Sequence, residues 1–208
     1  MAMPAIERVA IAIMAKAPIP GLTKTRLIPT IGAHAAAVLQ ERLTERAVAT
    51  ALAAAVGPVT VWCTPDLGHV AFRELVARHK IALKQQPDGD LGARMLAAMA
   101  ANTGPTLVIG TDCPALTPAH LQAAAAALHE ADVVLIPVED GGYVLIGARK
   151  PQPGLFADMT WSTATVLAET KARISRLELK AAELAPLWDI DTEEDLARFE
   201  REYPEFAL

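Results

Sequence analysis

Short apolar runs that alternate with alanine-rich stretches limit the possible folds of this sequence more than any other feature. Runs rich in β-branched residues occupy residues 9–14, 59–63, 81–84, 106–110 and 132–137. Between them, apolar residues recur at helical spacing in residues 33–56, 69–79, 91–102 and 118–130. Strands that alternate with helices in this way are typical of βα units in a mainly parallel sheet.

The alternation changes after residue 137. The segment EDGG (139–142) joins two apolar runs, as a turn between antiparallel strands would. Two further helices are expected, over residues 162–173 and 192–203, with Ser162 as the N-cap of the first. We therefore predict a single α/β domain over residues 1–208, with a mainly parallel but mixed sheet flanked by helices.

The composition restricts the choice of partner. The chain has 208 residues and a net charge of −5, which argues against a general nucleic-acid or membrane-surface binder. Its two cysteines are far apart in sequence, as expected for reduced thiols of a cytoplasmic protein. No apolar run approaches the roughly 18 residues of a membrane span, and the first fourteen residues do not resemble a secretory leader.

The stretch MAKAPIPGLTKTRL (14–27) places three cations on a bend directly after the first apolar run. The cations are Lys16, Lys24 and Arg26. Prolines and a glycine restrict such a bend, so its side chains are presented with little ordering cost. This arrangement predicts binding of an anion such as phosphate, the alternative being a rigid bend with solvated cations. A P-loop is disfavoured, because Thr23 rather than glycine precedes Lys24.

The stretch TLVIGTDCPALTP (106–118) ends an apolar strand in Gly110, Thr111 and Asp112. A carboxylate at the end of a buried parallel strand faces the cleft where ligands bind in open α/β sheets. It is also the hard oxygen ligand that Mg²⁺ or Mn²⁺ uses beside substrate phosphates. Asp112 is therefore a candidate metal ligand, the alternative being a cap of its own turn.

The segment EDGGYVLIG (139–147) supplies a second carboxylate, Asp140, able to bind a metal or to receive a proton from an acceptor hydroxyl. The glycines Gly141 and Gly142 let a backbone approach a ligand closely. Asp-Gly is also common hairpin turn chemistry, and on spacing alone the hairpin interpretation is the stronger.

Three further segments have weaker signals. Gly89, Asp90 and Arg94 surround a predicted helix start that could bind an anion, although Asp90 could simply cap that helix. For the acidic segment WDIDTEEDL (188–196) a structural role is favoured. Trp161 is interpreted as a packing residue or a base-stacking platform, and the five histidines are assigned no chemistry.

Six motifs in order carry a family resemblance. They are KAPIPGLTKTRL, GDLGARM, GTDCPAL, DGGYVLIG, WSTATVL and DIDTEEDL. Together they resemble an uncharacterised bacterial family of glycosyltransferase A-type proteins, sometimes called radical SAM/selenodomain-associated transferases, over residues 9–200. The resemblance implies a Rossmann-like nucleotide-diphosphosugar transferase fold, with Asp112 as the metal-binding aspartate and the opening loop at the nucleotide.

With this resemblance, the candidate site residues form three groups. Asp112 and Asp140 are the candidate catalytic and metal-binding residues. The candidates for nucleotide and phosphate binding are Lys16, Pro18, Gly21, Lys24, Thr25, Arg26, Gly89, Asp90, Arg94 and Thr111. The candidates for acceptor binding are Gly141, Gly142, Tyr143, Trp161 and Ser162.

Two enzymatic functions follow as hypotheses. The first is a glycosyltransferase-like enzyme that needs a divalent cation, Mg²⁺ or Mn²⁺, and uses a nucleotide-activated donor and a small-molecule acceptor. A homodimer is its candidate assembly. The second is nucleotidyl transfer from an NTP to a small phosphorylated or acidic metabolite. The opening cations and the segment Asp112-Cys113-Pro114 are similar to nucleotidyltransferases of the phospholactate guanylyltransferase and molybdenum-cofactor kinds. A third, non-enzymatic hypothesis is a nucleotide-binding regulatory subunit.

Overall fold

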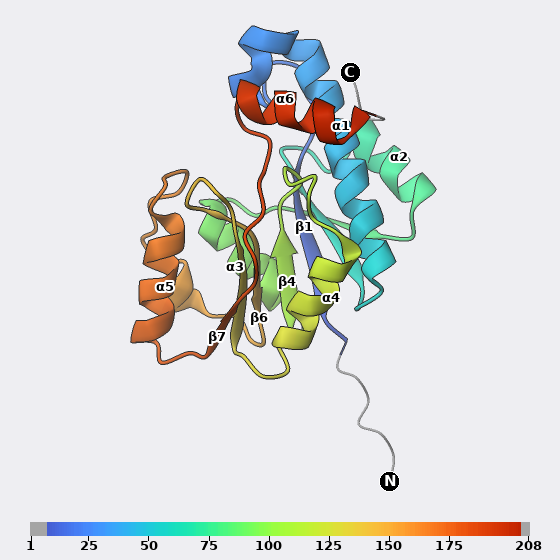
Figure 1. Cartoon of the computed structure of the whole chain (residues 1–208). Coiled ribbons are helices and arrows are strands. Elements are labelled where there is room, and N and C mark those ends of the chain that lie inside the picture. The colour runs from blue at the N-terminus through green and yellow to red at the C-terminus, as the bar shows by residue number, and fades with distance from the viewer. Residues whose placement is uncertain (1–7, 205–208) are drawn as a thin grey trace.

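A seven-stranded sheet forms the centre of the protein, as the computed structural model of residues 8–204 shows (Figure 1). The order of the strands is β3-β2-β1-β4-β6-β5-β7. Their bounds are β1 Ala10–Lys16, β2 Val59–Thr64, β3 Ala82–Gln85, β4 Thr106–Ile109, β5 Val133–Pro137, β6 Tyr143–Ala148 and β7 Ala181–Glu183. Only β6 runs antiparallel to its neighbours, β4 and β5.

Six α-helices surround the sheet in the described part of the chain. They are α1 Ile28–Ala54, α2 Val70–Arg78, α3 Leu91–Ala100, α4 Pro118–Ala127, α5 Val166–Arg176 and α6 Glu193–Glu202, with short 3₁₀ turns at Thr25–Leu27 and Pro153–Leu155. Gly32 interrupts α1 with a non-helical backbone, so its regular part begins where the spacing predicts.

Alternate residues of the central strands enter two separate cores, because successive side chains of a strand point to opposite faces. On one face Ile11, Ile13 and Leu107 pack against α1, α2 and α4. On the other, Ala12 and Val108 pack against α3 and α5. The result is a three-layer arrangement in which the sheet is covered on both sides.

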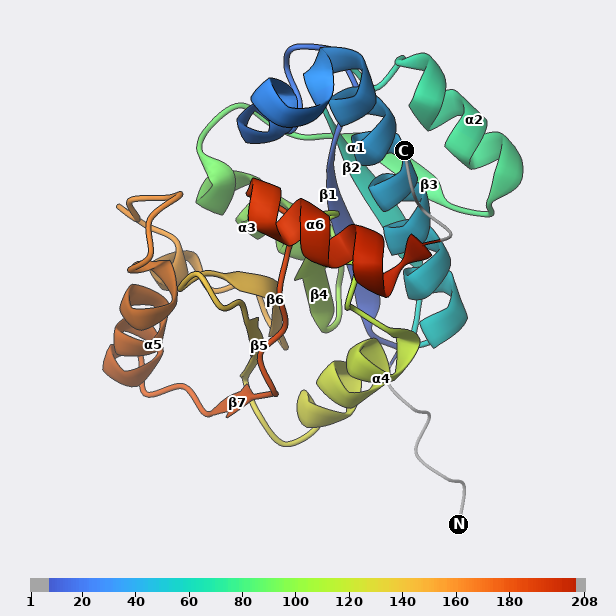
Figure 2. The ribbon, with the colours of Figure 1, turned by 45° about the horizontal axis from the view of Figure 1, so that its top comes forward.

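The last helix, α6, belongs to a third apolar cluster at one end of the sheet. Figures 1 and 2 show α6 lying across the N-terminal half of α1. Leu196 and Phe199 of α6 pack there with Leu39 and Leu43 of α1. The segment that leads into α6 also contributes Trp188 and Ile190, so it is held against the same end of the sheet.

The predicted α/β class, the mixed sheet and the hairpin at EDGG are confirmed. The helix predicted over residues 162–173 is wrong at its start, because the helix begins at Val166. Ser162 is therefore not its N-cap, and its φ of 62° places it in left-handed conformation. Strand β7 was not predicted. No helix in residues 8–204 is long and apolar enough to cross a membrane. The expectation that the first fourteen residues do not resemble a secretory leader rests partly on residues 1–7, which lie outside the described residues.

Candidate functional site

The candidate site lies where the strand order changes direction. The chain proceeds from β1 to β2 and β3 on one side, and β4 joins β1 on the other. Ligands of open α/β sheets bind outside the carboxyl ends of the strands at such a switch point. Lys16 is the last residue of β1, and Asp112 follows the end of β4. Two of the sequence candidates therefore flank this point.

A cavity of about 240 Å³ opens beside these strand ends, and we call it the cationic cavity. All three cations of the opening stretch line it, together with Asp112 and Asp191. The complete lining is Met14, Lys16, Thr23, Lys24, Thr25, Arg26, Gln40, Thr111, Asp112 and Asp191. The structure thus brings Lys16, Lys24, Thr25, Arg26 and Thr111 together, as their assignment to a phosphate site requires.

Two of these cations already have carboxylate partners. Lys24 Nζ lies 2.8 Å from Asp112 Oδ1 and donates a 2.6 Å hydrogen bond to the carbonyl of Ile190. Only 5% of the Lys24 side chain is exposed. Arg26 pairs with Asp191 on the surface. Lys16 is exposed and has no ion-pair partner in the described part of the chain, so its charge is free for an anion.

A buried polar chain positions Asp112 from the side of α1. Gln40 Nε2 donates to Thr111 Oγ1 at 3.0 Å, and Thr111 Oγ1 donates to Asp112 Oδ1 at 3.3 Å. Thr44 Oγ1 accepts a further hydrogen bond from Gln40 Nε2 at 3.3 Å. Gln40 and Thr44 were not recognised in the sequence, where they are two polar residues on the buried face of a helix.

A second cavity, of about 440 Å³, adjoins the first, and we call it the acidic cavity. The two cavities share Arg26, Asp112 and Asp191. Among the described residues, four carboxylates line the acidic cavity, and Arg26 is the only lysine or arginine in that lining. The complete lining is Arg26, Leu91, Asp112, Val138, Asp140, Gly142, Tyr143, Trp161, Ser162, Thr163, Ala164, Val166, Asp189 and Asp191. Asp140 and the acceptor candidates Gly142, Tyr143, Trp161 and Ser162 therefore meet in one place.

Asp189 and Asp191 reach these cavities on an extended segment. Leu187 N donates to Pro137 O, and Ile190 N donates to Asp112 O, which ties the segment to the ends of β5 and β4. Trp188 and Ile190 are buried, and the alternate residues Asp189 and Asp191 line the cavities. The structural role predicted for WDIDTEEDL is observed only in its second half, where Thr192 and Asp195 form a capping box. In the first half, the alternation of apolar and acidic residues in WDID was the sequence signal that could have indicated a strand-like segment with its carboxylates on one side.

The carboxylates of the acidic cavity affect one another electrostatically. The pKa of Asp189 is raised from 3.8 to about 7. Burial is the largest cause, the nearby carboxylates of Asp140 and Asp112 act in the same direction, and Lys24 opposes them. A carboxyl that titrates near neutrality inside a cavity can take up or release a proton during a reaction.

An aromatic wall closes one side of the acidic cavity. The rings of Trp161 and Phe156 are stacked, with centroids 6.4 Å apart and an interplanar angle of 29°. The Trp161 ring lies so close to Gly92 of α3 that a Cβ there would be 2.6 Å from a ring carbon. The indole is therefore fixed between Phe156 and α3. Of the two roles expected for Trp161, the packing role is observed.

Gly141 packs against the loop before α5 and lines neither cavity. Its φ is +92°, and a Cβ would lie 2.2 Å from the carbonyl oxygen of Ala164. Its own carbonyl accepts a hydrogen bond from Leu167 N at 2.9 Å. The close approach expected at this glycine is thus made by the loop before α5, and this contact also explains why that helix begins late.

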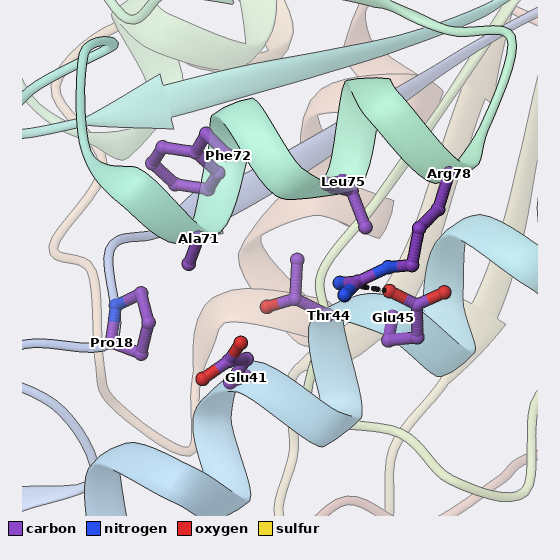
Figure 3. A pocket seen from close by; sticks show the side chains of 8 residues that line it. All are labelled: Pro18, Glu41, Thr44, Glu45, Ala71, Phe72, Leu75 and Arg78. Carbon is purple, nitrogen blue, oxygen red and sulfur yellow. Dashed lines mark hydrogen bonds and ion pairs between the residues drawn. The ribbon is translucent and has the colours of Figure 1, made fainter.

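Five other candidates line neither cavity. Asp90 caps α3 by accepting a 2.8 Å hydrogen bond from Ala93 N, which is the structural alternative considered for it. Arg94 donates to Gly89 O at 3.0 Å. Pro18 lines a hollow of about 10 Å³ between α1 and α2 (Figure 3), room for about one water molecule. Gly21 is exposed on the opening bend.

The donor set suits a hard divalent cation only in part. Among residues 8–204 no group of three His, Cys, Asp or Glu side chains is arranged to hold a metal ion. Mg²⁺, however, is commonly bound by one or two carboxylates and completed by water and substrate phosphates. The carboxylates of Asp112 and Asp140 beside the cationic cavity fit that second pattern.

A family model matches residues 47–163, more than half of the chain. The chain belongs to the DUF2064 family. That family is described as an uncharacterized protein conserved in bacteria. The finer radical SAM-associated label stays a prediction. No curated protein matches this sequence.

Solved structures extend the comparison. A protein from Desulfovibrio desulfuricans G20, provisionally assigned as a nucleotide-diphospho-sugar transferase, is 28% identical, with a TM-score of 0.84 over 96% of this chain and 89% of that one. A nucleotidyl transfer enzyme from Methanothermobacter thermautotroptrophicus is 15% identical, with a TM-score of 0.67 over 96% and 99%. A 4-diphosphocytidyl-2C-methyl-D-erythritol synthase from Anaerococcus prevotii is 10% identical, with a TM-score of 0.64 over 97% and 100%. The fold is that of nucleotide-diphospho-sugar transferases, and the comparisons support classing the DUF2064 protein as a transferase enzyme.

The contact at Gly141 predicts a loss of stability on substitution. Gly141→Ala should lower the free energy of unfolding by about 1 to 3 kcal/mol, because alanine is strained at this φ and collides with Ala164. Gly142→Ala is the matched control, since its Cβ would meet only side-chain atoms, at 3.3 Å and beyond. Urea denaturation measures both. Equal stabilities of the two variants would contradict the assigned contact.

The raised pKa of Asp189 predicts a pH-dependent stability. Between about pH 4 and pH 7 the folded protein holds a proton at Asp189 that the unfolded chain releases, so this carboxyl costs stability increasingly as the pH rises through that window. Without divalent cations, Asp189→Asn should therefore be more stable than wild type by on the order of 1 to 2 kcal/mol near pH 8, and by less near pH 5. The exposed Asp88→Asn is the control. A difference that does not change between the two pH values would disprove the shift.

Proposed function

We propose that this protein transfers a glycosyl group from a nucleotide sugar to a small-molecule acceptor, with the help of a divalent cation. The observation that carries the proposal is the pair of adjoining cavities that share Asp112 at the switch point of the sheet. One is lined by three cations and the other by four carboxylates. A diphosphate next to a reacting sugar needs these two different environments side by side.

The cationic cavity is the proposed site of the nucleotide phosphates. Lys16, Lys24 and Arg26 would donate charge-assisted hydrogen bonds to phosphate oxygens, and Thr25 and Thr111 supply hydroxyls. Asp112 and Asp140 would hold Mg²⁺ or Mn²⁺. When bound, the cation would neutralise negative charge on the leaving diphosphate.

The acidic cavity is the proposed site of the acceptor and of the transferred sugar. The bond from the anomeric carbon to the β-phosphate oxygen breaks, the bond to an acceptor oxygen or nitrogen forms, and the nucleoside diphosphate leaves. The proton lost by the acceptor would pass to Asp189 or Asp140, which line this cavity.

A second candidate function is nucleotidyl transfer from an NTP, in which the bond at the α-phosphorus is exchanged and pyrophosphate leaves. The three cations of the cationic cavity favour it, because a triphosphate carries more charge than the diphosphate of a nucleotide sugar. Structural neighbours of this class share the fold at low identity.

Calorimetric titration with NTPs, NDPs and nucleotide sugars, each with Mg²⁺ or Mn²⁺, separates the two functions. We expect one nucleotide sugar or its NDP to bind about tenfold more tightly than the matching NTP. Preference for an NTP, together with pyrophosphate release, would select nucleotidyl transfer. Absence of binding by every nucleotide would reject both.

Asp112→Asn tests the metal assignment. The amide oxygen can still accept from Lys24 and Thr111, whereas the charge that attracts a cation is lost. We expect the divalent-dependent part of nucleotide binding to fall by about tenfold or more. The fold should be retained but the melting temperature lowered, because the buried Lys24 ammonium loses its counter-charge. Asp88→Asn serves as the exposed control. Full retention of the metal effect in Asp112→Asn would remove Asp112 as a ligand.

A further inference from the structure

The charges of the acidic cavity differ from those of its neighbour in a way that selects the ligand. Asp112, Asp140, Asp189 and Asp191 face a single guanidinium, that of Arg26, which Asp191 already pairs. With all four carboxyls ionised, the lining residues carry a net charge of −3. Adding Lys24, which lies behind Asp112, still leaves twice as many carboxylates as cations.

An anionic group entering this cavity meets like charges without a free counter-charge. Like-charge contacts across an interface are costly and exclude wrong partners. With all four carboxyls ionised, one divalent cation at Asp112 and Asp140 brings the net charge of the lining to −1, or to 0 when Lys24 is counted. Asp189 adds no positive charge in either protonation state. Apart from the metal, the described lining therefore offers phosphate and carboxylate groups no unpaired cation.

The apolar side of the cavity specifies the remaining surface of the ligand. Trp161 is held by Phe156 and Gly92, and Leu91, 43% exposed, lies in the same lining. An aromatic side chain offers an apolar face. Ionised carboxylates accept hydrogen bonds but cannot donate them. A ring with apolar C–H groups on one face and hydroxyl or ammonium donors at its edge matches both properties.

We infer that the acidic cavity binds a neutral or cationic polyol, such as a sugar or an amino sugar, and excludes its phosphorylated form. This inference rests on the proposed function, because it names the class of acceptor for the same site. It also weighs against transfer to a phosphorylated or acidic metabolite, the acceptor class first considered for nucleotidyl transfer.

Matched probes test the charge preference. Glucose, galactose and mannose, each as the free sugar, the 2-amino sugar and the 6-phosphate, are titrated against the Mg²⁺-loaded protein by ligand-observed NMR. We expect the free or amino form of at least one sugar to bind about tenfold or more tightly than its 6-phosphate at low ionic strength. The difference should shrink in 1 M salt, where the screening length is about 3 Å.

Two variants locate the effect. Trp161→Ala should abolish binding of the preferred sugar, and Asp189→Asn should reduce the discrimination against the 6-phosphate while the free sugar still binds. Lys80→Ala, an exposed cation outside both cavities, is the control. A 6-phosphate that binds as tightly as the free sugar would overturn the inference, as would the absence of binding by all free and amino sugars at about 50 mM.

Nucleotide binding in the same samples keeps the two proposals apart. If a nucleotide binds and the 6-phosphates are preferred, the charge inference fails and the proposed function stands. If no nucleotide binds, the proposed function fails, whatever the sugars do.

Discussion

The site depends on one buried ammonium group. Lys24 Nζ joins the carboxylate of Asp112, at the end of β4, to the carbonyl of Ile190, in the segment before α6. Three parts of the chain far apart in sequence are thereby fixed around one charge. Burial of an ion pair is costly, and removal of either partner leaves the other charge uncompensated. The left-handed backbone of Lys24, with φ 48° and ψ 42°, is a further local cost that these contacts hold in place.

The sheet topology explains why cations and carboxylates are separated yet adjacent. The parallel strands β1 and β4 end at the same edge, so the loop after β1 brings the cations and the residue after β4 brings Asp112. The antiparallel hairpin between β5 and β6 turns at that same edge and contributes Asp140. The segment 187–191, which follows β7 in the chain, is hydrogen-bonded to the end of β5 and contributes two more carboxylates. The two cavities are thus a consequence of which strand ends meet, and Asp112 lies between them.

The sequence predicted the elements that depend on local patterns. Apolar runs located six of the seven strands, and Asp-Gly chemistry located the hairpin at Asp140. It did not predict β7, because three residues, Ala181–Glu183, with mostly exposed side chains have no periodicity to detect. The start of α5 also escaped prediction, since it is set by the contact of Gly141 with Ala164, a tertiary interaction. Asp189 and Gln40 become functional candidates because distant segments bring Asp189 near Asp112 and Gln40 to Thr111.

Under the proposed function, the ion pair of Lys24 couples two binding events. Lys24 can turn toward a phosphate only by giving up Asp112, and Asp112 would then remain beside Asp189 and Asp140 without its counter-charge. Release of Lys24 is therefore favourable only when another cation neutralises Asp112. Binding of phosphate at Lys24 and binding of a cation at Asp112 support each other, which is a coupling free energy between neighbouring sites. Under the proposed function, the same pair that stabilises the ligand-free site would therefore favour binding of nucleotide and cation together.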